Sequence, residues 1–308
     1  MTSNKKLELE LQELFKQKEY SKVVFEITSQ TNEQERSAFL CNLLGLSRVS
    51  NNKKNIDVLN LAIKDFKNGY LKEKNTNHAL DALANFITTS VLLIDLEKNY
   101  KFDFTEILEF YKSSEKFCSN HKIIHLAMAM VYRRLNDSER LTFHFDKIIK
   151  SKNFTADDLC NYGYWRCFGK EWSQADFLKY GSFVDENLQI LPEDKLLEIS
   201  QETGSKIRIG FLSSDILQGH SITYFLKTVL KNFDKNKFEI ILLLSNAKED
   251  QLTQSFKNLV TKTINISGLD NISALNRIRE LKLDITIDLM GYTSRHRIEL
   301  FKNRLAKK

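Results

Sequence analysis

The chain has 308 residues, 42% of them apolar and 28% charged, which is typical of a globular protein large enough for two cores. Its net charge of +6 comes from 46 basic and 40 acidic residues that are mixed along the sequence, so no basic block predicts a nucleic-acid partner. The first residues carry frequent charges, unlike a secretory signal, and runs such as Ile240 to Leu244 are too short to cross a bilayer. We expect a cytoplasmic protein with no nucleic-acid or membrane partner.

Residues 1–191 show almost only helical periodicity. Apolar residues recur at helical spacing in five successive pairs of segments, which short polar turns separate. The paired segments are 7–15 with 23–27, 39–49 with 56–66, 79–96 with 104–117, 123–135 with 141–149, and 159–168 with 175–184. Antiparallel helix pairs stacked in chain order predict an α-solenoid.

Small and aromatic residues within these pairs are spaced as in a tetratricopeptide repeat. Ala129, Tyr132 and Phe145 occupy the small and the two aromatic positions, at offsets of 3 and 16. Gly163 follows Ala129 by 34 residues, which is the length of that repeat, and Ala175 takes the small position of the next helix. The second and middle pairs fit less well, so we predict a degenerate tetratricopeptide-like array, with a generic helical bundle as the alternative.

The cysteines of the helical half do not form a recognisable metal or disulfide pattern. Cys41, Cys118, Cys160 and Cys167 are scattered without a CxxC pair, as reduced and buried thiols are. The spacing of Cys118, His121 and His125 would place all three on one helix face. A zinc site needs a fourth ligand, and the sequence shows none, so we predict no metal.

The pattern changes after the only proline, Pro192, which opens a polar linker over residues 192–204 with a short helix at 194–200. Four short β-rich runs then alternate with helical stretches. The runs are 207–212, 238–244, 263–266 and 284–289, and the helical stretches are 221–233, 251–260, 273–281 and 297–304. This alternation predicts a small parallel four-stranded α/β lobe over residues 205–308, with helices on both faces.

Polar residues follow the first and fourth predicted strands, where a parallel sheet places its ligands. They are Ser213, Ser214, Asp215 and His220 after the first strand, and Gly291, Tyr292 and Thr293 after the fourth. His220 begins a helix, so its ring can accept a proton from a hydroxyl or orient a phosphate, or it can simply be a capping or solvent-exposed histidine. Asp215 either orders the loop through backbone N–H groups or reaches the acceptor.

The second group of polar residues also has two interpretations. Gly291 permits close approach of the backbone, while Tyr292 and Thr293 supply hydroxyls to a substrate. The same residues fit a strand-to-helix turn that is capped by Thr293 or Ser294. Arg297 can meet a phosphate, although a solvated helix face explains it equally well.

The segments RIGFLSSD, HSITYFL, IDLMGYT and RHRIELFKNR resemble the protein O-linked N-acetylglucosamine transferases of glycosyltransferase family 41, over roughly residues 205–304. The resemblance implies a tetratricopeptide array joined to the first of two Rossmann-like lobes in a GT-B arrangement. It also implies transfer of a sugar from a UDP-sugar, UDP-GlcNAc above all, to acceptor proteins or peptides held on the helical array. By the same resemblance His220 matches a site histidine of the family.

The sequence also departs from this family. The last family motif normally continues as Arg-Pro-Ala-Pro into a second, nucleotide-binding lobe, whereas here Arg304 precedes only Leu305 to Lys308, and Arg295 replaces a small residue. No glycine-rich loop of the kind that binds a diphosphate follows any predicted strand.

We therefore expect a truncated protein glycosyltransferase that has little activity alone. Its last helix should then leave the apolar side chains of Ile298, Phe301 and Leu305 partly bare. The alternative is a non-enzymatic tetratricopeptide scaffold that binds a partner protein. A stand-alone nucleotide-binding domain is less compatible with the missing glycine-rich loop.

Overall fold

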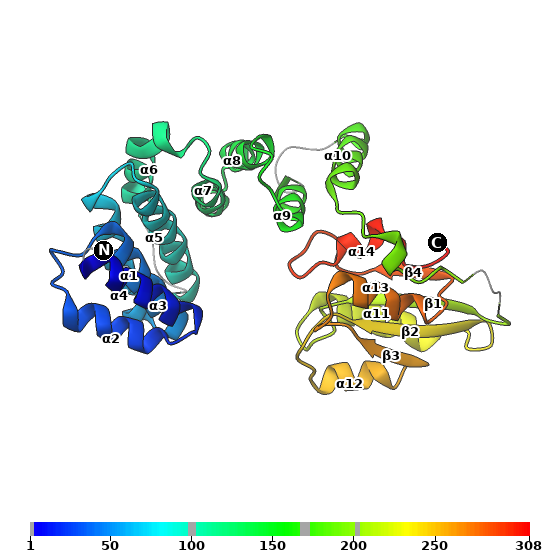
Figure 1. The fold of residues 1–308 in the computed structure, drawn as a ribbon. Helices are drawn as coiled ribbons and strands as arrows, with labels where there is room; N and C mark the ends of the chain where they lie inside the picture. The colour runs from blue at the N-terminus through cyan, green and yellow to red at the C-terminus, as the bar shows by residue number, and fades with distance from the viewer. Residues whose placement is uncertain (1–2, 98–102, 167–172, 201–203) are drawn as a thin grey trace. The chain divides into compact units, whose positions relative to one another are not determined.

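A computed structural model describes residues 3–97, 103–166, 173–200 and 204–308 (Figure 1). The chain divides into two compact units, residues 1–154 and 155–308, and each is considered by itself. This division places the last two helices before the linker in the same unit as the sheet. The boundary at residue 191 and the linker over 192–204 stay predictions, and Cys167 lies outside the described residues.

The first unit is helical, as the periodicity predicted. Its helices are α1 (Ser3–Lys16), α2 (Tyr20–Gln30), α3 (Ala38–Asn51), α4 (Ile56–Lys72), α5 (Asn77–Leu96), α6 (Thr105–Cys118), α7 (Lys122–Arg134) and α8 (Ser138–Lys150). Polar residues begin several of them: the side chains of Ser37, Asn55 and Thr76 each accept a hydrogen bond from a backbone N–H of the first turn. Successive helices pack on one another around a core that includes Phe66 and Tyr70.

Two buried polar pairs lie inside this unit. Arg48 Nε lies 2.7 Å from Asp65 Oδ2, and burial raises the pKa of Asp65 to about 6. The rings of His125 and His144 face one another with their Nδ1 atoms 2.9 Å apart, and His144 stacks on Tyr132. Burial lowers the pKa of both histidines, that of His144 to about 3, so this pair is held uncharged.

Helix α5 corrects the expectation that no segment is apolar enough to cross a membrane. By length and composition α5 is long and apolar enough to cross a membrane, and its most apolar window has a mean hydropathy of 1.5. Its apolar residues do not form one uninterrupted run, because polar residues are scattered among them. However, 61% of its most apolar window is buried, and α5 packs on α3, α4 and α7, as a core helix does.

The second unit contains helices α9 (Ala156–Arg166) and α10 (Gln174–Asn187), followed by the parallel sheet with its own helices. The strands are β1 (Ile207–Ser213), β2 (Phe238–Leu244), β3 (Lys262–Asn265) and β4 (Ile285–Asp288), and the helices are α11 (Ser221–Asn232), α12 (Gln251–Lys257), α13 (Asn271–Arg279) and α14 (Ile298–Lys302). The sheet order is β3-β2-β1-β4, with Ile209 of β1 paired to Ile240 of β2 and to Ile285 of β4. This confirms the predicted Rossmann-like lobe.

Alternate residues of the strands enter two separate cores, so helices cover both faces of the sheet. On one face Phe211 and Leu242 pack with Leu226 of α11 and Phe256 of α12. The opposite core contains residues from β1, β2, α13, α14 and the segment after α10, namely Leu191, Leu212, Ile241, Leu243, Leu275, Ile278, Leu300 and Leu305. This two-sided burial explains why β1 and β2 are almost continuously apolar.

Two sequence expectations for this unit are wrong. The helix predicted over 194–200 is only a three-residue 3-10 turn, Glu193–Lys195. Leu305 is buried rather than bare, because Lys308 exchanges backbone hydrogen bonds with Asp284 (2.9 Å) and Thr286 (3.0 Å) and draws the residues before it onto the core.

The segment after α10 is fastened to the same core. Asn303 accepts a hydrogen bond from the backbone N–H of Leu191 (2.6 Å) and donates one to the carbonyl of Gln189 (3.1 Å). Arg279 donates to the carbonyl of Leu197 (2.6 Å). Residues 189–197 are therefore held on α13 and α14.

Candidate functional site

Most of the candidate residues lie on the loops that follow β1 and β4 at the carboxyl edge of the sheet, where these two strands are neighbours (Figure 1). From β1 the chain continues to β2 and β3 on one side, whereas β4 lies on the other side of β1, so the strand order reverses at this point. Ligands of open α/β sheets bind at such a reversal. The two loops also touch, since the N–H of Ser214 lies 3.1 Å from the sulfur of Met290.

Ser213 and Ser214 are fully buried, and their hydroxyls are used within the loop that follows β1. The Ser213 hydroxyl accepts a hydrogen bond from the N–H of Asp215 (3.0 Å), and the Ser214 hydroxyl donates to the Asp215 carboxylate (2.9 Å). In this arrangement the two serines fix the loop and the orientation of Asp215.

His220 lies where the loop turns into α11, and its side chain is 46% exposed. Its ring makes no capping hydrogen bond with the helix, so the capping interpretation does not describe it. Its Nε2 lies 3.7 Å from a carboxylate oxygen of Asp215, which is itself mostly covered. A carboxylate at this distance can orient the ring. Gly219, at a φ of +86°, provides the turn immediately before it.

The loop after β4 is a tight turn around the carboxylate of Asp288. That carboxylate accepts hydrogen bonds from the N–H groups of Met290 (2.9 Å) and Gly291 (3.0 Å), and Gly291 has a φ of +54°. Burial raises the pKa of Asp288, while the two N–H groups oppose the shift. Thr293 donates to the carbonyl of Met290 (2.7 Å), as in a turn. The predicted cap is wrong, because α14 begins only after Arg297, so neither Thr293 nor Ser294 caps it.

Helices α9 and α10 contact the same turn. The ring of Tyr292 packs edge-on against Tyr180 of α10, with 5.8 Å between the ring centres. The imidazole of His296 is nearly buried, and its Nε2 lies 2.9 Å from the carboxylate of Asp157 at the start of α9. These contacts could not be predicted from the sequence, because more than 100 residues separate the partners.

Arg297, the remaining predicted site residue, serves the protein backbone. Its two terminal nitrogens lie 3.3 and 3.2 Å from the carbonyl oxygen of Leu269. Burial lowers the pKa of its guanidinium. The structure therefore places Arg297 as a link between α14 and the connection after β3.

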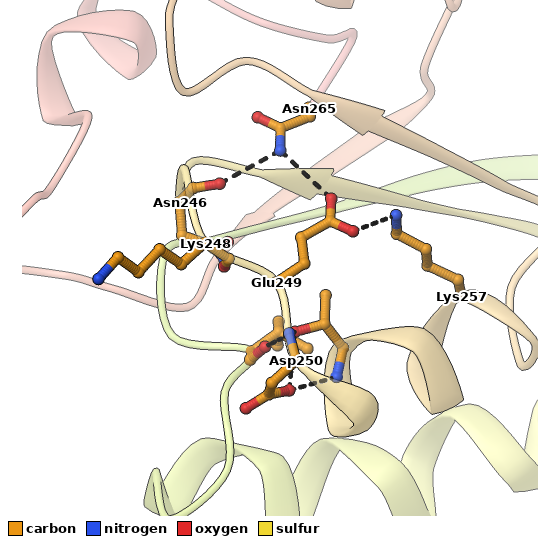
Figure 2. A network of polar contacts seen from close by, with 8 residues as sticks. Asn246, Lys248, Glu249, Asp250, Lys257 and Asn265 are labelled. Atoms are coloured by element: carbon orange, nitrogen blue, oxygen red, sulfur yellow. Dashed lines mark hydrogen bonds and ion pairs between the residues drawn. The ribbon is translucent and has the colours of Figure 1, made fainter.

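A polar network that sequence reasoning missed follows β2 and β3 at the same edge (Figure 2). Asn265 donates to the carbonyl of Asn246 (3.2 Å) and to the carboxylate of Glu249 (3.4 Å), which also pairs with Lys257 (2.5 Å). Beside them Asp250 caps α12 and accepts a hydrogen bond from a residue of the His220 loop. The spacing from Asp250 to a threonine three residues later is a capping signal that was available in the sequence.

Two cavities of the sheet unit lie away from this edge. One, of about 590 Å³, is bounded by residues 190–199 together with Arg279 and Lys302. The other, of about 550 Å³, lies at the amino end of β2 and includes Lys206 and Phe233. Neither is lined by a candidate site residue. Among the described residues, no three of His, Cys, Asp or Glu are grouped to hold a metal ion, and His121 and His125 have other partners, Asp81 and His144.

Comparison with known proteins agrees with this arrangement. No family model matches the chain. A probable UDP-N-acetylglucosamine–peptide N-acetylglucosaminyltransferase SPINDLY of Arabidopsis thaliana is 30% identical over 96 residues, which is 30% of this chain and 10% of that protein. The corresponding Solanum lycopersicum protein is 26% identical over 133 residues, or 42% of this chain and 13% of that protein. A solved mutant of the Thermobaculum terrenum O-GlcNAc transferase matches with a TM-score of 0.58 and 13% identity.

The chain is O-GlcNAc transferase-like. Its structural match covers 87% of this chain and 49% of the solved transferase, and it includes both the tetratricopeptide-like helices and the Rossmann-like lobe. The matched segments span only about a tenth of the length of the curated relatives. At this level of identity the structural likeness establishes the fold, and the site must be argued from its own residues.

Proposed function

We propose that the chain is part of a UDP-sugar-dependent protein glycosyltransferase, in which the sheet unit carries the acceptor side of the active site. The observation that supports this best is the pairing of His220 with Asp215 at the reversal of strand order, in a chain similar to O-GlcNAc transferases. The helical array then presents acceptor proteins or peptides. The proposed setting is the cytoplasm, without a nucleic-acid or membrane partner.

In the proposed reaction the hydroxyl oxygen of an acceptor side chain attacks the anomeric carbon of the sugar. The bond from that carbon to the diphosphate oxygen breaks, and UDP leaves. His220 accepts the hydroxyl proton or orients the phosphate, and Asp215 stabilises the protonated imidazole. Such a single displacement needs no covalent carboxylate intermediate and inverts the anomeric centre.

UDP-GlcNAc is the proposed donor, by similarity to the named relatives. Because the chain covers 49% of the solved transferase, we further propose that the 308-residue polypeptide transfers little sugar by itself. Measured hydrolysis and transfer from UDP-GlcNAc by the purified chain test this, and robust turnover would contradict it.

The role of His220 is tested by His220→Ala, with His78→Ala as the matched control at an exposed histidine of the helical unit. Transfer to a peptide acceptor, followed by mass spectrometry under single-turnover conditions, should fall by about a hundredfold or more in the first variant and stay unchanged in the second. Equal and measurable transfer in both variants would remove His220 from the mechanism. Binding of a partner protein without any transfer would favour the non-enzymatic scaffold.

A further inference from the structure

We propose that Asp250 is a positioning residue that holds the His220 loop in its working place, together with Thr253. The proposal rests on the function proposed for His220. It adds a role for the connection between β2 and α12, which is remote from His220 in the sequence. A set of hydrogen bonds runs from this connection to the loop after β1.

Two bonds fasten the loop immediately before His220. The backbone N–H of Gln218 donates to a carboxylate oxygen of Asp250 (2.7 Å), and the buried hydroxyl of Thr253 donates to the carbonyl of Ile216 (2.6 Å). Gly219 is the single residue between Gln218 and His220, and it turns the chain with its φ of +86°. Gln218 and His220 are thus only two positions apart, and the backbone N–H of His220 also donates to the carbonyl of Leu217 (3.2 Å) in the same loop.

The imidazole ring itself has few constraints. Nearly half of its surface is exposed, it makes no capping bond, and Asp215 lies at 3.7 Å. The position of the ring is thus set mainly by the backbone that carries it, and this backbone is what Asp250 and Thr253 hold.

The connection that carries Asp250 is braced from its other side (Figure 2). Asn265 at the end of β3 and Lys257 of α12 both contact Glu249, the residue before Asp250. Asp250 also caps α12 by accepting the N–H of Thr253 (2.8 Å) with its second carboxylate oxygen. The hydrogen bond from Gln218 is the largest cause of the lowered pKa of Asp250, which keeps the carboxylate ionised and both oxygens available as acceptors.

The two carboxylate oxygens of Asp250 accept different hydrogen bonds, one from Gln218 and one from Thr253, so a substitution can remove the first and keep the second. Asp250→Asn leaves one oxygen acceptor, and asparagine caps helices as well as aspartate does. The variant can therefore keep the cap of α12 while the N–H of Gln218 loses its partner. Asp270→Asn is the matched control, because Asp270 caps α13 through the N–H of Ser273 (2.8 Å), at a site away from the His220 loop.

Hydrogen exchange of the full chain is the first measurement. We expect the amides of residues 216–221 to exchange about tenfold faster in Asp250→Asn, as loss of one hydrogen bond to a charged group implies, with no change in Asp270→Asn. Thr253→Val should loosen the same segment, and Thr253→Ser, which keeps the hydroxyl, should restore its protection. Unchanged exchange of 216–221 in Asp250→Asn, with α12 intact, would overturn the proposal.

Single-turnover transfer from UDP-GlcNAc is the second measurement. Asp250→Asn should lower the rate of the transfer step without weakening the apparent affinity for donor, and it should add no further loss to His220→Ala. An additive loss in the double variant would contradict positioning through His220. If His220→Ala leaves transfer unchanged, the proposed function fails, whereas the exchange result still decides whether Asp250 holds the loop.

Discussion

Lowering the pH should open the pair of helices α7 and α8, because His125 and His144 are buried without charge between them. In the folded chain the pKa of His144 is about 3, against an ordinary value of 6.5, so below pH 6.5 the unfolded chain binds more protons than the folded one. The contribution of His144 to stability is therefore complete above pH 6.5 and is lost as the pH falls toward 3. At about pH 5 the loss amounts to roughly 2 kcal/mol, or about a 30-fold change in the opening equilibrium.

The loss of stability at pH 5 hardly depends on the pKa of His144 in the folded chain, since any folded pKa below about 4 gives the same loss. The shift of His125 acts in the same direction, and Lys147 adds repulsion to any charge placed on the pair. Asp65, whose pKa is raised to about 6, acts in the opposite direction in the same unit, because its folded form binds the extra proton. A titration of the parent chain alone would mix these effects.

A non-titrating replacement separates them. In His144→Asn the amide keeps a polar group near the position of Nδ1. In the parent chain, protection of the α7 and α8 amides against hydrogen exchange should fall between pH 7 and about pH 5, and in His144→Asn most of this fall should disappear. Intrinsic exchange rates are corrected for pH, and His78→Asn, at an exposed histidine of the same unit, should keep the parental pH dependence. An undiminished pH dependence in His144→Asn would refute the assignment to this pair.

Four further substitutions, two of them combined in one double variant, test the packing of the two units. Gly210→Ala places a Cβ 2.6 Å from a methyl group of Leu283, and tryptophan fluorescence during urea unfolding should show the sheet unit destabilised by about 1–3 kcal/mol; unchanged stability would refute the close fit. Met290→Leu removes the sulfur that accepts the N–H of the loop after β1, and the same assay should report a loss of about 1 kcal/mol with faster exchange in that loop. Arg48→Met should destabilise the helical unit by about 3 kcal/mol in circular dichroism, and the double change with Asp65→Leu should recover most of the loss.

Periodicity predicted the helices and strands well, because a helix that buries one face and a strand that is buried on both faces each leave a regular pattern of apolar residues. The helix pairs and all four strands lie within a few residues of their expected positions. The exceptions are segments whose structure depends on distant partners. The short segment at 194–200 is not helical because Arg279 and Asn276 bind its backbone, and Leu305 is buried because the last residues pair with β4.

The site was predictable only at the level of strand ends. Polar residues after β1 and β4 indicated a common edge, and the sheet order brings them together there. The contacts of these loops were not predictable, because their partners are distant in the sequence: Met290 lies after β4, Asp250 before α12 and Asp157 in α9. Ser213 and Ser214 were expected to face a ligand because they follow the first strand, yet their hydroxyls serve Asp215.

The fastening of residues 189–197 matters for anyone who wishes to excise the sheet unit for expression. A cut at residue 205, where the composition changes, would remove Leu191 from the core and deprive Asn303 and Arg279 of their backbone partners. It would also discard the aromatic and ionic contacts that α9 and α10 make with the turn after β4. Residues 189–197 are part of the folded sheet unit, and a cleavage point before α9 keeps that unit intact.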